Sequence, residues 1–306
     1  MRVLITGATG TIGLAVADAL QARGDQVVAL SRDPERAQRV LGSNAEVHAW
    51  CEPSAEPPPP EALSGAEAVV HLLGEPIAQR WTEEAKARIR DSRVMGTRSL
   101  VRGLEMLADG QRPRVLVSQS ATGYYGPRGD LPLDEQASPG SDFLAEVVIA
   151  WEQEAAAAAP AMRVAQTRTG VVLSPSGGAL AKMLPFFRLG LGGPVAGGEQ
   201  YVPWIHLDDV VGALLRCLDD DGAEGAVNLA APNPVTNAEL SRALGRALGR
   251  PALLPVPGFA LRLLYGEMAG IVTSGQRVIP ARLGELGYQF DHPQVEPALR
   301  DVLTQS

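Results

Sequence analysis

Lysine is nearly missing from this chain of 306 residues. Only Lys86 and Lys182 are present, so almost all of the 27 basic residues are arginines. The 35 acidic residues bring the net charge to −8, and no block of basic residues occurs. A surface that binds the phosphate backbone of DNA or RNA needs clustered positive charge. We therefore expect no nucleic-acid partner, and a catalytic lysine has only two positions available.

Cysteine and long apolar runs are also scarce. Cys51 and Cys217 are too few for a disulfide framework, and with four scattered histidines they show no metal-ligand spacing, so we expect no metal site. No apolar stretch reaches the roughly 18 to 20 residues of a membrane helix, and we expect no membrane partner. Apolar strand residues begin at Val3, ahead of which a secretion signal would not fit. The sequence predicts a cytoplasmic protein.

Hydrophobic residues, with Trp, Tyr and Cys counted among them, make up 45% of the chain. Over the first 170 residues they follow an alternating strand and helix pattern. This pattern is typical of a parallel sheet with helices on its faces. The predicted strands are Val3–Thr6, Gln26–Leu30, Ala68–Leu72, Val115–Ser118 and Val164–Thr169. The predicted helices are Ile12–Ala22, Pro34–Leu41, Thr82–Leu107 and Phe143–Ala159.

The pattern is less regular afterwards. We predict a loop at the proline-rich Glu52–Pro60, and over Ser174–Gly198 the sequence becomes rich in glycine and proline with no clear element. Strands are predicted at Tyr201–His206 and Ala226–Leu229, and helices at Asp208–Leu218 and Thr236–Leu248, with Thr236 and Glu239 forming a capping box. The fold class is α/β: a Rossmann-type doubly wound parallel sheet over residues 1–172 and 201–231, and a smaller, mostly helical substrate-side domain over 173–200 and 232–306.

A glycine-rich turn, Thr6-Gly7-Ala8-Thr9-Gly10-Thr11-Ile12-Gly13, joins the first predicted strand to the first helix. Gly7 permits a tight turn, Gly10 lets the backbone approach a pyrophosphate, and Gly13 allows close packing of helix on sheet. The first amides of the helix would then face the diphosphate. The turn predicts a dinucleotide site formed by Gly7, Thr9, Gly10, Thr11 and Ile12. The alternative is a purely structural turn.

Ser31-Arg32 follows the second strand, where an NAD site would place an acidic residue on the ribose. A guanidinium with a neighbouring hydroxyl suits a 2′-phosphate, so NADP is the expected cofactor. In the alternative interpretation Arg32 is merely solvated and Asp33 binds the ribose.

With these motifs the chain resembles the extended short-chain dehydrogenase/reductases, and within them the atypical branch called epimerase-family proteins, which ends in a small domain of unknown function. The motifs that carry the resemblance are the glycine turn, His71–Ile77, Asp91-Ser92-Arg93, Ser120–Gly126, Arg168–Leu173, Leu189–Pro194, Pro203–His206, Asn228–Pro232 and Gly275–Pro280.

The resemblance implies that an NADP groove is lined by Ser31, Arg32, Leu72, Leu73, Gly74, Arg93 and Val172. His71 stands where relatives usually have Asn, and we interpret it as a packed histidine at a strand end. Leu73 replaces a smaller residue and could crowd the adenosine. The resemblance further implies an oxidoreductase or nucleotide-sugar epimerase-like activity on an unidentified small molecule, and we consider a homodimer.

The Tyr-x-x-x-Lys pair of this superfamily is missing. Four residues before Lys86 and Lys182 stand Thr82 and Gly178, and the helix that should carry the tyrosine has Phe143-Leu144 and Val147-Val148 instead. Two explanations remain. Either catalysis uses Ser120 with Tyr124 or Tyr125, or the protein is a non-catalytic NADP(H)-binding sensor or interaction module. Whether it is an enzyme therefore stays open.

Each candidate also has a structural interpretation. Ser120 would orient a substrate carbonyl, or merely cap a turn. Tyr124 is the weaker candidate, because no cation neighbours it in the sequence. Asp208 is expected to cap a helix rather than to act with His206. Trp204 and Met183–Phe187 would wall an apolar cleft or the core.

Overall fold

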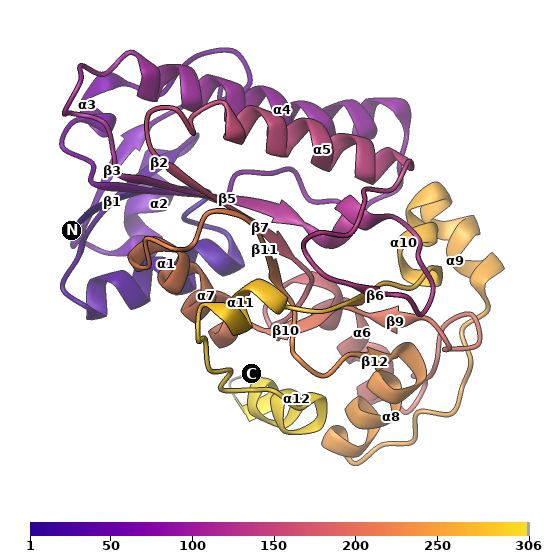
Figure 1. The fold of residues 1–306 in the computed structure, drawn as a ribbon. Helices are drawn as coiled ribbons and strands as arrows, with labels where there is room; N and C mark the ends of the chain where they lie inside the picture. Colours follow the sequence, from indigo (N-terminus) through magenta and orange to yellow (C-terminus); the bar gives the residue numbers. More distant parts are fainter. Residues whose placement is uncertain (305–306) are drawn as a thin grey trace.

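Seven parallel strands form the central sheet of the computed structural model, which describes residues 1–304 (Figure 1). Their order is β11-β7-β5-β4-β1-β2-β3. The strands are β1 (Arg2–Thr6), β2 (Gln26–Ser31), β3 (Ala45–Ala49), β4 (Ala68–His71), β5 (Val115–Ala121), β7 (Arg163–Thr169) and β11 (Gly225–Leu229). The strand order reverses between β1 and β4, and ligands of doubly wound sheets bind at the carboxyl ends of the strands beside such a reversal. The predicted Rossmann-type sheet is confirmed.

Helices cover both faces of the sheet (Figure 1). One face carries α1 (Thr11–Ala22), α2 (Pro34–Leu41) and α7 (Leu207–Asp219), and the other carries α3 (Pro60–Leu63), α4 (Glu83–Glu105) and α5 (Phe143–Ala156). Because strand side chains alternate, Val3 and Ile5 pack with the first layer and Leu4 with the second, all fully buried. Burial on both faces explains why the strands are continuous apolar runs.

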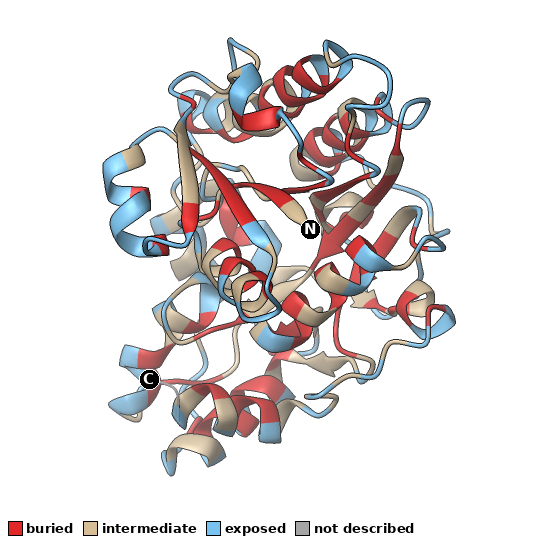
Figure 2. Ribbon diagram, turned by 90° about the vertical axis from the view of Figure 1, so that its left-hand side faces the viewer, coloured by how far each residue is buried: buried red, intermediate tan, exposed pale blue. Residues whose placement is uncertain are grey.

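A further hydrophobic core lies among α6 (Gly178–Arg188), α8 (Asn237–Leu248) and α12 (Val295–Thr304). Figure 2 shows buried residues lining the inner faces of these helices as well as the sheet. The short strand pairs are β8 (Val171–Leu173) with β10 (Trp204–His206), β9 (Tyr201–Val202) with β12 (Val235–Thr236), and β6 (Pro132–Leu133) with β13 (Arg277–Val278). The remaining helices are η1 (Thr122–Tyr125), α9 (Gly258–Tyr265), η2 (Gly266–Met268), α10 (Ala269–Thr273) and α11 (Ala281–Glu285).

Three expectations about the elements were wrong. No element was predicted over Ser174–Gly198, yet this stretch contains α6, because Leu180, Leu184 and Phe187 recur at helical spacing and are buried, despite Pro185 inside the helix. The edge strand β3 was not predicted, since its sequence Ala-Glu-Val-His-Ala holds a single large apolar residue. The predicted strand Tyr201–His206 is divided at Pro203 into β9 and β10.

The ends of two helices give one correction and one confirmation. Helix α7 is capped by the side chain of His206, whose Nδ1 accepts from the Asp208 amide at 3.1 Å, so the cap is not Asp208. The capping box of Thr236 and Glu239 on α8 is present as predicted. Within residues 1–304, no helix is long and apolar enough to cross a membrane.

Candidate functional site

The glycine turn between β1 and α1 has the geometry that its sequence predicts. Gly7 has φ +68°, and a Cβ there would lie 2.7 Å from the Leu72 carbonyl oxygen. A Cβ on Gly13 would lie 2.2 Å from the Gly7 carbonyl oxygen, so helix and turn touch through backbone alone. Gly10 is exposed at the start of α1, where no side chain caps the helix. The open amides and the helix dipole make this end a site for an anion.

At the end of β2 the three polar residues have different roles. The Ser31 hydroxyl donates to the Asp33 carbonyl at 3.0 Å, and the Asp33 carboxylate caps α2 by accepting the Arg36 amide at 3.0 Å. Arg32 is exposed, and its guanidinium makes no hydrogen bond or ion pair with residues 1–304. The carboxylate is therefore engaged locally, whereas the guanidinium is available to a ligand.

The side chains of His71 and Arg93 support the loop after β4. His71 is fully buried between the hydroxyls of Thr6, 2.8 Å from Nδ1, and Thr97, 2.9 Å from Nε2, and burial lowers its pKa to about 3. Arg93 donates to the Glu75 carbonyl at 3.0 Å, and burial lowers its pKa to about 10. The packed strand-end interpretation of His71 is confirmed. Arg93 acts here on the backbone of the loop.

The other residues of the predicted groove surround the same turn. Leu73 packs down toward α4, with its Cδ2 3.0 Å from where a Cβ of Gly96 would lie, and Gly74 is exposed. Leu72 and Val172 are half-buried against the core on the α1 side. Thr11 borders the segment that leads into α6, since a Cβ on Gly177 would lie 2.4 Å from its hydroxyl oxygen. The predicted residues thus gather at the carboxyl edge of β1, β2, β4 and β8.

A buried ion pair stands at the carboxyl ends of β5 and β7. Arg168 of β7 donates to both carboxylate oxygens of Glu152, at 2.8 and 2.9 Å, and the Ser120 hydroxyl donates to the same carboxylate at 2.6 Å. Burial alone would lower the pKa of Arg168, but the pair with Glu152 outweighs burial and raises it above its ordinary value. Ser120 is 1% exposed, and its hydroxyl hydrogen is donated to Glu152. In this state the hydroxyl does not cap a turn and does not face solvent.

The two tyrosines of η1 flank this pair. The Tyr125 hydroxyl accepts from Arg168 at 3.1 Å and donates to Asn228 Oδ1 at 2.6 Å, and burial raises its pKa to about 12. Tyr124 is half-buried, with the Arg168 guanidinium carbon 3.4 Å from its ring centroid. Tyr124 therefore has a cation beside it, supplied by Arg168 of β7 rather than by its own segment. Sequence neighbours could not reveal this contact.

Apolar side chains of α5 face the loop that carries Tyr124. A Cβ on Gly123 would lie 3.5 Å from Leu144 and 3.8 Å from Val148, so α5 presents these two residues to the loop that carries Tyr124. The Arg168–Glu152 ion pair lies against the Tyr124 ring through its guanidinium. Sequence reasoning did not assign a role to this pair. The available signal was an arginine and a glutamate at positions whose neighbours are core residues, because charged residues are rarely buried without a partner.

The sequence of this chain matches two known protein families. The family described as "NAD dependent epimerase/dehydratase family" matches residues 3–230, and a domain of unknown function, DUF1731, matches residues 256–302. A chloroplastic epimerase family protein, the SDR39U1 homolog of Arabidopsis thaliana, is 40% identical over 99% of this chain and 87% of its own length.

Several solved structures are similar over the whole chain, and two of them are also at least 30% identical in sequence. The crystal structure of human epimerase family protein SDR39U1 with NADPH has a TM-score of 0.90 and 35% identity, and both chains are fully covered. A nucleoside-diphosphate sugar epimerase from Corynebacterium glutamicum has a TM-score of 0.78 and 32% identity, with all of this chain and 59% of that chain covered.

Proposed function

This chain belongs to the NAD dependent epimerase/dehydratase family, within the group of SDR39U1 epimerase family proteins, and from this premise we propose that it is an NADP(H)-dependent oxidoreductase or epimerase-like enzyme acting on a small molecule. The observation that carries the proposal is the combination of an uncapped glycine turn on α1 with an unengaged Arg32 at the end of β2. A relative with the same fold has been solved with NADPH.

The NADP(H) site would use the backbone of the turn and the end of β2. Thr9, Gly10, Thr11 and Ile12 would bind the diphosphate, since an anion at this helix start is stabilised by amides and dipole. Arg32, with the Ser31 hydroxyl, would bind the 2′-phosphate through charge-assisted hydrogen bonds. Gly7, Leu72, Leu73, Gly74, Arg93 and Val172 would shape the rest of the groove.

Bound NADPH supplies a hydride to a substrate carbonyl carbon, or NADP⁺ accepts one from an alcohol carbon. We assign Tyr124 to give a proton to the carbonyl oxygen, or to take it from the alcohol, because its hydroxyl makes no hydrogen bond with residues 1–304 and its ring lies on a cation. Arg168 is the cation beside the Tyr124 ring, although it comes from β7 rather than from four residues after the tyrosine. Ser120 would contribute through Glu152, or directly if its hydroxyl turns from that carboxylate to a substrate.

The test is NADPH oxidation with a panel of carbonyl substrates. Tyr124→Phe should lower turnover by about 10² to 10⁴, the usual contribution of a positioned general acid, and leave NADPH affinity unchanged. Ser120→Ala is the second variant and should lower turnover as well. Full activity in the Ser120→Ala/Tyr124→Phe double variant would refute the assignment.

The second candidate function is a non-catalytic NADP(H)-dependent sensor or interaction module. It is favoured by Leu144 and Val148, the apolar side chains that α5 presents to the loop of Tyr124. This alternative requires that no substrate of the panel is turned over and that a partner protein distinguishes the NADPH-bound protein from the free protein.

The proposal also covers the domain division, the cellular compartment and the oligomeric state. Residues 1–172 and 201–231 would form the NADP(H)-binding domain, and residues 173–200 and 232–306 the substrate-side domain. The protein would act in the cytoplasm as a homodimer. Light scattering after size-exclusion chromatography measures the oligomeric state, and a monomer at all concentrations would contradict the dimer.

A further inference from the structure

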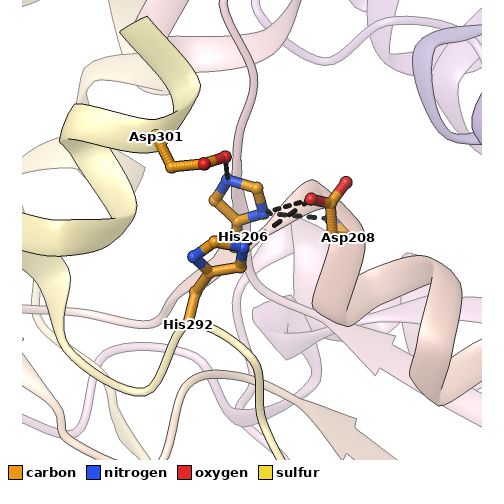
Figure 3. A group of neighbouring side chains, drawn as sticks. All are labelled: His206, Asp208, His292 and Asp301. Carbon is orange, nitrogen blue, oxygen red and sulfur yellow. Dashed lines mark hydrogen bonds and ion pairs between the residues drawn. The ribbon is translucent and has the colours of Figure 1, made fainter. Parts of the chain in front are cut away.

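Two of the four histidines, far apart in the sequence, meet at the start of α7. His206 ends β10 and His292 lies in the loop before α12, and their rings stack with centroids 3.7 Å apart and an angle of 26° between planes (Figure 3). Two aspartates face them, Asp208 from the first turn of α7 and Asp301 from α12. One ligand atom from each of the four residues can be chosen so that all lie within 4.8 Å of one another. The histidines are scattered in the sequence, but the fold brings His206 and His292 together.

The distances between these atoms are close to those around a bound transition-metal ion. Asp208 Oδ2 lies 3.6 Å from His206 Nδ1 and 3.6 Å from His292 Nε2, and Asp301 Oδ2 lies 3.3 Å from His206 Nε2. Zinc bonds of about 2.0 to 2.2 Å in a tetrahedron separate neighbouring ligand atoms by roughly 3.3 to 3.6 Å. Small movements of side chains would therefore bring three ligand atoms onto one ion.

His206 shows which nitrogen is the ligand. The ring is fully buried, and Nδ1 already acts as an acceptor, toward the Asp208 amide. The proton of the neutral ring is then on Nε2, which makes no hydrogen bond with residues 1–304 and is directed at Asp301. Metal-bound histidines typically donate their second ring nitrogen to a carboxylate, and Asp301 Oδ2, 3.3 Å from Nε2, is placed for this role once the ring moves onto the ion. A buried imidazole without a hydrogen-bond partner for its N–H is otherwise costly.

We propose that His206 Nδ1, His292 Nε2 and Asp208 Oδ2 bind a divalent transition-metal ion of the zinc class, and that Asp301 orients His206. At His206 Nδ1 the ion would replace the hydrogen bond from the Asp208 amide. The side chain of His292, which is 18% exposed, would rotate out of the stack so that the lone pair of Nε2 points at the ion. Asp208 is half-exposed, so the remaining coordination positions are open to water.

The ion would join the C-terminal segment to the nucleotide-binding sheet. Asp209 already holds this loop, because its carboxylate accepts the amides of Asp291 and His292 at 2.8 and 3.0 Å. A metal at His292 and Asp208 would add a second connection between the same loop and the first turn of α7. None of the residues assigned to NADP(H) or to proton transfer takes part.

The experiment is a calorimetric titration of chelator-treated protein with Zn²⁺, followed by Co²⁺ as a probe with visible absorption. The wild type should bind one equivalent per chain, with a rise in melting temperature. Asp301→Asn should weaken affinity about 10- to 100-fold, as loss of an outer carboxylate does. His292→Ala should remove stoichiometric binding, and the control His48→Ala, a histidine paired with Glu46 elsewhere, should leave it intact.

The proposal is overturned if the wild type binds no stoichiometric Zn²⁺, or if His292→Ala binds it as the wild type does. Should His292→Ala not fold, Asp208→Asn decides the matter, because that carboxylate is half-exposed and its loss spares the core. Retained Zn²⁺ affinity in folded Asp208→Asn would contradict the ligand set.

Discussion

His71 makes the stability of this fold sensitive to mild acid. Its ring is fully buried at the end of β4 between two threonine hydroxyls, and burial lowers its pKa to about 3. In the unfolded chain a histidine binds a proton near pH 6.5. Between these two values the unfolded state carries a proton that the folded state does not. His71 therefore contributes stability fully above pH 6.5 and loses that contribution as the pH falls toward 3.

The size of this effect follows from one proton. Well below pH 6.5 each pH unit lowers the free energy of unfolding by about 1.4 kcal/mol. Because the unfolded histidine is already half-protonated at pH 6.5, the step from about pH 6.5 to 4.5 lowers it by about 2 kcal/mol through His71 alone. His71→Asn keeps a polar side chain but removes the titration. Its stability should be lower than that of the wild type at pH 6.5, and the difference should shrink by about 2 kcal/mol at pH 4.5.

Urea denaturation at the two pH values measures this difference, because other titrating groups contribute equally to both proteins. Parallel pH profiles for the wild type and His71→Asn would show that the buried ring does take up a proton in the folded state. The account of the β4 end as a dry, closed support for the loop of Leu72 to Gly74 would then be refuted.

Two further predictions concern the turn and the buried pair. Gly10→Val should abolish NADPH binding in calorimetry. It should retain the circular dichroism of the fold, because its Cβ would meet only the Gly7 carbonyl oxygen, at 3.3 Å. Gly13→Ala, by contrast, should lower thermal stability, because its Cβ would lie 2.2 Å from the same oxygen. Bound NADPH in folded Gly10→Val would contradict the diphosphate site. Glu152→Ala should cost about 3 to 5 kcal/mol in denaturant unfolding, since it leaves the Arg168 charge buried without its partner; a loss below about 1 kcal/mol would show that the pair is hydrated.

The nucleotide-binding half of the fold could be predicted because its signals are local. Buried parallel strands leave apolar runs. The turn from Thr6 to Gly13 requires glycine at Gly7 and Gly13, because a Cβ there would lie only 2.7 and 2.2 Å from backbone oxygens. Helix α6 and strand β3 were missed because proline, glycine and polar residues interrupt their patterns, and tertiary packing decides their conformation.

The catalytic region and the histidine cluster depend on contacts between distant segments. The sequence shows Tyr124 without a cation, but β7 brings Arg168 to its ring, and α5 supplies Glu152 for Arg168 and Ser120. His206 and His292 meet only because α12 and its preceding loop return to the start of α7. A sequence pattern carries residue types, while these pairings follow from the path of the chain.

The central claim, a site selective for NADP(H), is tested most directly by titrating the protein with NADPH and with NADH in a calorimeter. A charge-assisted hydrogen bond from Arg32 to the 2′-phosphate should contribute about 1.5 to 3 kcal/mol, so NADPH should bind roughly 10- to 100-fold more tightly. Arg32→Asp should erase this preference, and Arg39→Asp, an equally exposed charge in the last turn of α2, should keep it. Equal affinities of the wild type for NADPH and NADH would contradict the account.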